Sequence, residues 1–153
     1  MSNTKVTPRL PPRWFMRLFW FTHRRVYRLT RGHVGLWRPK RKGWGAMRVN
    51  TIGRRSGLEH SVMVGYFEDG PNLVVLAMNG WGEGEPAWWL NLQAQPAVRV
   101  DLPDGPRQVT AHAAHGDERE RLWSRWREID KNLDEFATLR STETAVVVFE
   151  PRP

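Results

Sequence analysis

The segment with the clearest chemical potential is TIGRRSG at residues 51–57, which sets two arginines and a serine between two glycines. Arginine binds phosphate through paired N–H donors, and glycine permits a tight turn and a close approach of the backbone to a ligand. Arg54, Arg55 and Ser56 therefore predict a turn that holds an anionic group. Taken alone, the same residues also fit an ordinary β-turn with solvated charges. The spacing excludes a Walker loop.

A second segment, PAWWLNL at residues 86–92, predicts a short helix that carries two tryptophans and Asn91. Packing of Trp89 and Leu92 in a core is one interpretation of it. An amide among apolar neighbours needs hydrogen-bond partners, however, so Asn91 favours a ligand site. The glycine-rich residues 77–85 could offer backbone donors and acceptors to the polar edge of a ring. The turn and the helix together predict a phosphorylated heteroaromatic cofactor.

Other catalytic patterns are missing from the sequence. It contains no cysteine, which excludes disulfides, thiolate metal sites and a cysteine nucleophile. Its five histidines form no HExxH motif and no i,i+4 pair, and no GxSxG occurs. We therefore predict neither a metal site nor a serine-hydrolase site, and the sequence assigns no catalytic residue.

The net charge of +8 is unevenly distributed along the 153 residues, which suffice for one domain. Residues 1–58 contain fifteen Lys and Arg and no acidic residue, whereas residues 59–153 carry nine basic and sixteen acidic residues. The basic part predicts a polyanionic partner or an anionic membrane surface. No secretory signal or membrane-spanning stretch is evident, so we expect a cytoplasmic protein, with the inner face of the cell membrane as a peripheral location.

The pattern of residues 13–31 predicts a helix that could bind an anionic membrane surface. Apolar residues fall on one face of this stretch and arginines on the other, as in an interfacial amphipathic helix. Packing of its apolar face against the rest of the protein and binding to nucleic acid are the alternatives. Nucleic acid is disfavoured because no helix-turn-helix, zinc-finger or RNP motif occurs. The polar, proline-bearing residues 1–12 are expected to be disordered.

Short segments rich in Val, Ile and aromatic residues predict six strands, at residues 47–52, 61–67, 73–78, 97–101, 108–112 and 145–149. Turn residues at 68–72 and 103–106 predict antiparallel hairpins, and hence a small barrel or curled sheet. Helices are predicted at 116–130, with Asp117 as the N-cap, and at 133–139. We expect one α+β domain over residues 13–153, dominated by β-structure, with its barrel core at residues 46–151.

In this order the motifs resemble the deazaflavin (F420)-dependent nitroreductase family. The resemblance covers roughly residues 34–151 and follows TIGRRSG, a hairpin, LVVLAMNGWGEGEPAWWLNLQAQPAVRV, GDERERLW and a closing VVVFEP. It implies an FMN-binding-like split β-barrel and the coenzyme F420, whose phosphodiester and oligoglutamate tail are anionic. Members are typical of actinobacteria, and they transfer hydride from the reduced deazaflavin to quinones, nitro compounds and other activated double bonds.

Two groups of residues would bind the cofactor according to this resemblance. The phosphate and acidic tail would bind to the turn residues Arg54, Arg55, Ser56 and Gly57. His60 would contribute to the same site, at a position where the family often has a basic residue. The deazaflavin ring would lie against backbone and the ring-side motif: Ala77, Met78, Asn79, Trp88 and Asn91.

One segment departs from the family's pattern. Well-studied members carry tyrosines before the last strand, where one orients the substrate or gives a proton, but residues 130–136 read DKNLDEF. Leu133 and Phe136 predict an apolar pocket there, which favours a hydrophobic quinone, enone or lipid over a nitroimidazole. The proton donor stays open among solvent, the cofactor, Asp134 and His112. An FMN-dependent split-barrel oxidoreductase and a non-catalytic F420 or lipid carrier are the alternative functions.

Overall fold

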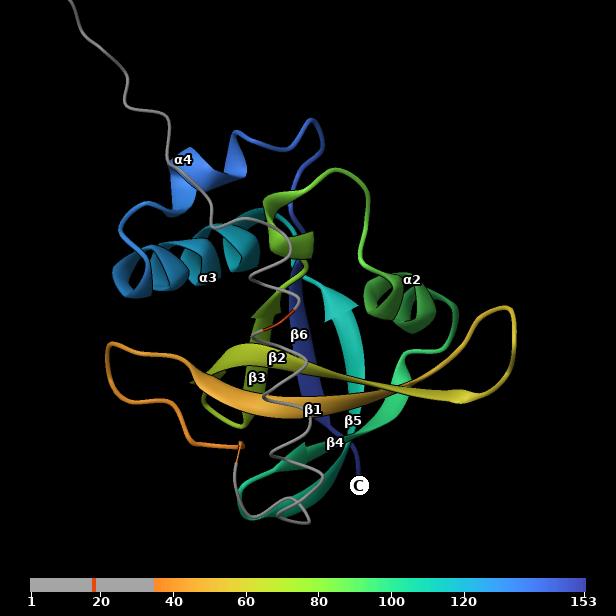
Figure 1. Cartoon of the computed structure of the whole chain (residues 1–153). Helices are drawn as coiled ribbons and strands as arrows, with labels where there is room; N and C mark the ends of the chain where they lie inside the picture. The colour runs from red at the N-terminus through yellow and green to blue at the C-terminus, as the bar shows by residue number, and fades with distance from the viewer. Residues whose placement is uncertain (1–17, 19–34) are drawn as a thin grey trace, which may run out of the picture.

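Six antiparallel strands close into a barrel in the order β1-β2-β3-β6-β5-β4 (Figure 1). The computed structural model describes residue 18 and residues 35–153. Its strands are β1 (Gly45–Ile52), β2 (Glu59–Asp69), β3 (Asn72–Leu76), β4 (Ala97–Leu102), β5 (Gly105–Ala113) and β6 (Val146–Pro151). All six predicted strands are present, and the β-dominated barrel is confirmed. The disordered segment predicted at residues 1–12 lies outside the described residues, and so does the helix predicted at 13–31, apart from residue 18.

Two tight hairpins set the register of the barrel. Asp69 pairs with Asn72 across a two-residue turn, in which Gly70 has φ +58°, as the first position of a type II′ turn requires. Leu102 pairs with Gly105 in the second hairpin, so β5 begins three residues earlier than the sequence predicted. The barrel closes where β1 pairs with β4, from Arg48 opposite Asp101 to Asn50 opposite Arg99.

The barrel interior is filled by one face of each strand. In β6, Val147 and Phe149 point into this interior, whereas Val146 and Val148 belong to a second core outside it. This double burial explains the uninterrupted apolar runs of β3 and β6, because a strand that is buried on both faces has no polar side. The short helix α2 (Ala87–Ala94) contributes Trp89 and Leu92 to the interior core.

Helices α3 (Gly116–Ile129) and α4 (Leu133–Ala137) form the second core against the outer face of β3 and β6. Figure 1 shows them together on one side of the barrel, apart from α2. The N-cap of α3 is His115, not Asp117, because His115 is the last residue with extended backbone (φ −131°, ψ 157°). Asp117 instead lies in the first turn of α3, where its charge favours the positive end of the helix.

Leu133 and Phe136, from which an apolar pocket was expected, pack against other side chains of the protein. Leu133 is 1% exposed and belongs to the second core. The ring of Phe136 stacks on Trp81 with centroids 5.9 Å apart. An apolar side chain looks alike in sequence whether it lines a pocket or packs in a core, and here Leu133 packs in the second core and Phe136 on Trp81.

Candidate functional site

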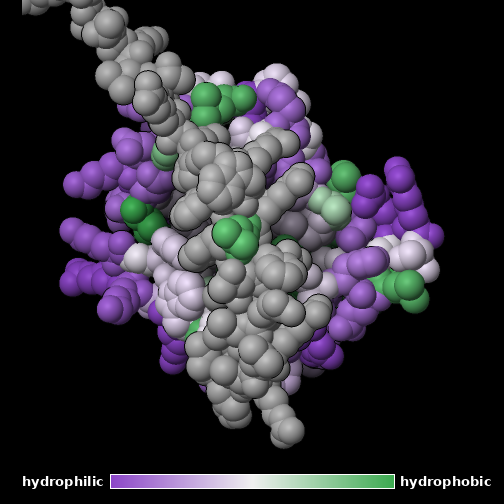
Figure 2. Space-filling model, in the orientation of Figure 1, coloured by the Kyte–Doolittle hydropathy of each residue, from purple (hydrophilic) through white to green (hydrophobic). Residues whose placement is uncertain are grey.

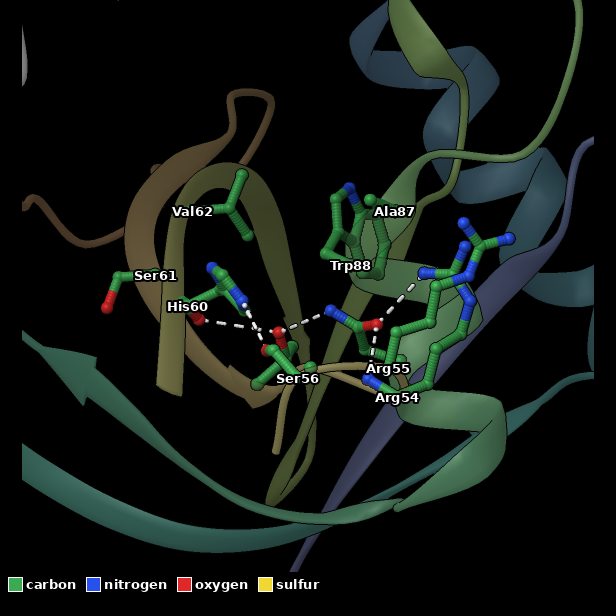
Figure 3. A pocket seen from close by; sticks show the side chains of 11 residues that line it. Arg54, Arg55, Ser56, His60, Ser61, Val62, Ala87 and Trp88 are labelled. Carbon is green, nitrogen blue, oxygen red and sulfur yellow. Dashed lines mark hydrogen bonds between the residues drawn. The ribbon is translucent and has the colours of Figure 1, made fainter. Parts of the chain in front are cut away.

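A cleft of about 440 Å³ opens between the β1–β2 turn and the start of α2 (Figure 3). This volume falls within the usual range of small-molecule sites. Figure 3 shows His60 and Val62 on one wall, Ala87 and Trp88 on the other, and the arginines at the turn. The described residues that line the cleft are Thr51, Gly53, Arg54, Arg55, Ser56, His60, Ser61, Val62, Ala87, Trp88 and Asn91.

The β1–β2 turn is closed by backbone hydrogen bonds at both of its glycines. Gly53 N–H donates to Leu58 O at 2.7 Å, and Gly57 N–H donates to Gly53 O at 2.8 Å. Gly57 has φ +71°, a conformation that favours glycine. At Gly53 the requirement is space, because a Cβ there would lie 2.5 Å from Ser56 Oγ. The glycines therefore shape the turn, as the sequence indicated.

Ser56 and His60 are joined across this turn. Ser56 Oγ accepts a hydrogen bond from Leu58 N–H at 3.2 Å and lies 3.3 Å from His60 Nε2. The turn therefore holds a hydroxyl and an imidazole close together at the cleft. Both are groups that can donate hydrogen bonds to an anionic oxygen.

Asn91 is only 5% exposed and ties α2 to the turn. Its Oδ1 accepts hydrogen bonds from Arg54 N–H at 3.2 Å and from Arg54 Nη1 at 3.1 Å. Its Nδ2 donates to Thr51 Oγ1 at 3.2 Å, and that hydroxyl donates to His60 O at 3.3 Å. The amide that the sequence marked as needing partners finds them in the arginine turn, 37 residues away along the chain.

The electrostatic character of the cleft is positive. Arg54 and Arg55 extend from the turn in the same direction in Figure 3. Arg55 forms no hydrogen bond or ion pair with another described residue, and none of the described residues that line the cleft is acidic. Two neighbouring guanidinium groups without a carboxylate partner attract an anion strongly.

The opposite wall comes from the first turn of α2. Ala87 and Trp88 line the cleft, whereas Trp89 and Leu92 are buried in the barrel core. Core packing was the alternative interpretation of this helix, and it holds for these two residues. Trp88 is half-buried, so one indole at the cleft remains available for contact with a ring.

The three residues expected to place backbone against a ring do not line this cleft. Ala77 is fully buried, and its N–H donates to Ala145 O at 3.0 Å. Asn79 uses its side chain to close the following loop, since Nδ2 donates to Glu83 O and Gly84 O. Met78 is 38% exposed, and its N–H makes no hydrogen bond within the described part of the chain. The structure therefore brings Trp88 and Asn91 to the arginines, whereas residues 77–79 lie on a separate loop and do not line the cleft.

Sequence reasoning missed Arg140, which holds this loop from the segment before β6. Its side chain is fully buried and pairs with Glu85 at 3.2 Å. No periodicity or motif singles out this arginine, because four of its five partners lie 55 to 63 residues earlier in the chain.

Neither side chain considered as a proton donor lines the cleft. Asp134 accepts hydrogen bonds from Trp123 Nε1 and Arg127 Nε, which hold the pKa of its carboxyl below the usual range and keep it ionised. His112 lies between Glu118 and Glu150, 2.9 and 3.4 Å away. Tyr66 is in the barrel core, where burial raises the pKa of its phenol to about 12.

Comparison with known proteins gives a consistent set of similarities. A model of the F420H(2)-dependent quinone reductase family matches residues 20–151. A Mycobacterium tuberculosis protein named as such a reductase is 30% identical over 100 residues, covering 65% of this chain and 83% of the relative. A second from the same species is 29% identical over 105 residues, covering 66% and 68%. The solved structure of an F420-H2 dependent reductase is 26% identical with a TM-score of 0.62, covering 76% of this chain and all of that one.

Proposed function

This chain belongs to the F420H(2)-dependent quinone reductase family, which makes it an F420-dependent oxidoreductase, and we propose that its cleft binds the phosphate and acidic tail of that cofactor. The observation that carries the proposal is that Arg54 and Arg55 both line a cleft whose described residues include no acidic one. A polyanionic tail would supply the negatively charged partners that these guanidinium groups do not have among the described residues of the cleft.

The donor set of the cleft fits such a group. Beside the arginines it offers Ser56 and His60, each with a side chain that can donate to a phosphate oxygen, whereas the hydroxyl of Ser61 already donates to Asn50 Oδ1 at 2.7 Å. Ala87 and Trp88 begin an α-helix at the same cleft, so the positive end of that helix adds to the field. In the proposal, the β1–β2 turn and His60 bind the phosphate, and Asn91 holds Arg54 in place.

The deazaflavin ring is proposed to lie between the loop at residues 77–79 and Trp88. When bound, the reduced cofactor supplies the hydride that a quinone accepts. The residues of this chain would orient the ring and exclude water from it. Met78 contributes an N–H without a partner among the described residues, and Trp88 contributes an indole face. We assign no side chain as the proton donor.

A quinone or another hydrophobic acceptor is the proposed substrate. The two tyrosines of the chain are Tyr27 and Tyr66, and the second is buried in the barrel core. The segment before the last strand, residues 130–136, contains no tyrosine, and its aromatic residue Phe136 packs on Trp81. A hydrophobic acceptor depends on apolar contact more than on such a hydroxyl.

The experiment that tests this function is a titration of the purified chain with oxidised F420 and, separately, with FMN. We expect saturable binding of F420 and a change in its fluorescence, and oxidation of F420H2 when a quinone is added. Binding of FMN in preference to F420 would instead support the flavin-dependent alternative. Tight binding of F420 without turnover on any quinone, enone or nitroaromatic would support a carrier.

We also propose that the basic N-terminal part places the enzyme on an anionic membrane surface. The predicted helix at 13–31 lies outside the described residues except for residue 18, so support comes from the segment that follows it. There Trp37 and Trp44 are 40% and 42% exposed with ring centroids 5.1 Å apart, and they flank four Lys and Arg residues. Indoles beside cations are typical of protein surfaces at a membrane interface.

This association would be peripheral. None of the described helices combines the length and apolar character that crossing a membrane requires. On the face shown in Figure 2, the described surface is mostly hydrophilic, with apolar residues in small separate patches. Contact through a few indoles and many charges fits such a surface better than deep insertion does.

A further inference from the structure

All five N–H donors of Arg140 are used inside the protein. Nε donates to Gly82 O at 3.1 Å. Nη1 donates to Ala77 O at 3.1 Å and to Thr144 Oγ1 at 2.9 Å. Nη2 donates to Gly84 O at 2.8 Å and to Glu85 Oε1 at 3.2 Å. A guanidinium has five such donors, so this buried group is completely satisfied, as a buried charge must be.

Four of these partners belong to one segment, the loop between β3 and α2. Ala77 is the residue after β3, Gly82 and Gly84 are in the loop, and Glu85 is two residues before α2. The guanidinium therefore fixes both ends and the middle of this loop from a distant part of the chain. Because α2 begins at Ala87, the same contacts place Ala87 and Trp88 at the cleft.

The contact with Ala77 also determines the direction of a backbone donor. In a planar trans peptide, the carbonyl of one residue and the N–H of the next point in opposite directions. The Ala77 carbonyl points at Arg140, so Met78 N–H must point away from it. This N–H makes no hydrogen bond to the described residues, and Met78 is 38% exposed.

We propose that Arg140 is a positioning residue for the deazaflavin ring, which aims Met78 N–H at the polar edge of that ring. This inference rests on the proposed function. Arg140 does not touch the ring itself; it acts through the Ala77–Met78 peptide and the loop. The planar guanidinium group suits this positioning role, because its N–H donors have fixed directions and hold several carbonyls at set angles. A single ammonium group cannot do so.

The test compares Arg140→Lys with Arg152→Lys in the full chain. Arg152 is a matched control, since it also donates to backbone carbonyls, those of Val98 and Val109, but on strands away from the cleft. The ligands are F420 and a deazaflavin that has the ring and ribityl chain but no phosphate or glutamate tail. The amide resonance of Met78, observed by ¹H–¹⁵N NMR, reports the orientation of the donor without any need for turnover.

We expect Arg140→Lys to weaken binding of the tail-less deazaflavin about tenfold, the scale of one lost hydrogen bond, and to shift the Met78 amide resonance before ligand is added. Arg152→Lys should leave both unchanged. If Arg140→Lys fails to fold, Glu85→Leu, which removes one of the five partners, should give the same changes with smaller size.

The outcomes separate the two proposals. Equal ring affinity in Arg140→Lys and the unmodified chain, or an equal loss in Arg152→Lys, would overturn the role of Arg140 and leave the function standing. A Met78 resonance that does not move when F420 binds the unmodified chain would also overturn it. Failure of the unmodified chain to bind F420 at all would overturn the function, and this inference with it.

Discussion

Asn91 Oδ1 accepts two hydrogen bonds from the same residue, one from the backbone N–H of Arg54 at 3.2 Å and one from its Nη1 at 3.1 Å. A buried amide on α2 thus fixes both the position of the turn and the direction of its first guanidinium. Nε and Nη2 of Arg54 form no hydrogen bond with another residue in the described part of the chain. In the proposed function, Asn91 would therefore prepare the anion site without having to contact the anion.

The first prediction concerns the charge at the position of Asn91 Oδ1. Asn91→Asp keeps the shape of the side chain and its acceptor, but the new carboxylate neutralises Arg54 at short range. We expect the variant to fold, with an affinity for F420 lowered about tenfold or more because one charge-assisted contact is lost. Fluorescence titration with F420 measures this affinity.

Asn91→Leu is the companion variant, because it removes the hydrogen bonds without adding charge. It leaves Arg54 N–H and Thr51 Oγ1 without their buried partner, which should cost about 1–3 kcal/mol of the free energy of unfolding. Urea denaturation measures that loss. If Asn91→Asp binds F420 as tightly as the unmodified chain, the proposed role of Arg54 is wrong.

The contact between Asn91 and Arg54 shows where sequence reasoning reached its limit. The turn and the helix were both recognisable, because glycine, arginine and tryptophan have strong local preferences. Their contact was not, because 37 residues separate them and only the closed barrel brings them together. The placement of Asn91 near the ring, which the resemblance implied, stays a prediction, and the structure adds that its side chain binds the turn.

Leu133 and Arg140 illustrate the same limit in the helical part. An apolar side chain looks alike in sequence whether it lines a pocket or packs under a helix, and Leu133 packs in the second core. Arg140 resembles any surface arginine until its five partners are known. The strands were easier to place, since runs of branched apolar residues between turn residues are a local signal.

Gly53 provides a steric test of the turn. A Cβ at this position would lie 2.5 Å from Ser56 Oγ and 2.9 Å from His60 Nε2, so Gly53→Ala must push these groups apart. We expect a clear loss of F420 affinity with a small loss of stability, measured by titration and thermal unfolding. Gly43→Ala is the control, because the nearest atom to its Cβ would be 3.8 Å away. An unchanged affinity in Gly53→Ala would show that the Ser56–His60 arrangement is not needed for binding.

The lowered pKa of Asp69 predicts how the free energy of unfolding depends on pH. Hydrogen bonds from Arg121, opposed in part by burial, lower the pKa of Asp69 from its ordinary value of 3.8. A depressed carboxyl pKa in the folded state adds stability above the unfolded-state pKa, and this stability is lost as the pH falls through the folded-state value. Asp69→Asn should therefore lower the free energy of unfolding by roughly 1 kcal/mol at pH 7.

Urea denaturation at a series of pH values measures this difference. The difference in free energy of unfolding between the unmodified chain and Asp69→Asn should be constant from neutral pH down to about pH 5. It should shrink below the ordinary carboxyl pKa. Asp104→Asn, in the exposed β4–β5 turn, serves as the control for removal of one negative charge. A difference that persists unchanged at pH 2 would mean that packing of the side chain, and not its charge, accounts for the loss.

Membrane association can be tested with sedimentation of vesicles. Replacing Arg24 and Arg28 by Glu reverses two charges on the polar face of the predicted helix at 13–31. We expect the full chain to sediment with phosphatidylglycerol vesicles at low salt, and the variant to do so much less, since each basic residue near such a surface adds about 1 kcal/mol. Arg121→Glu together with Arg127→Glu, on α3, is the matched control. Equal sedimentation of all three proteins would count against the helix as the contact.

The last prediction concerns the arginines themselves. Arg54→Ala and Arg55→Ala should each weaken F420 binding about tenfold or more, because each removes a charge-assisted contact to a phosphate or carboxylate group. The affinity of the unmodified chain should also fall steeply as salt is raised from 0.05 to about 0.5 M, since salt screens charges at the surface. In the variants this dependence should be shallower, and Arg127→Ala, which lies on α3 and pairs with Asp134, should leave both quantities unchanged. The tail-less deazaflavin completes the argument: it lacks the anionic groups, so its affinity should be the same in the arginine variants as in the unmodified chain. An equal loss of affinity for both ligands would place the arginines at the ring and not at the tail.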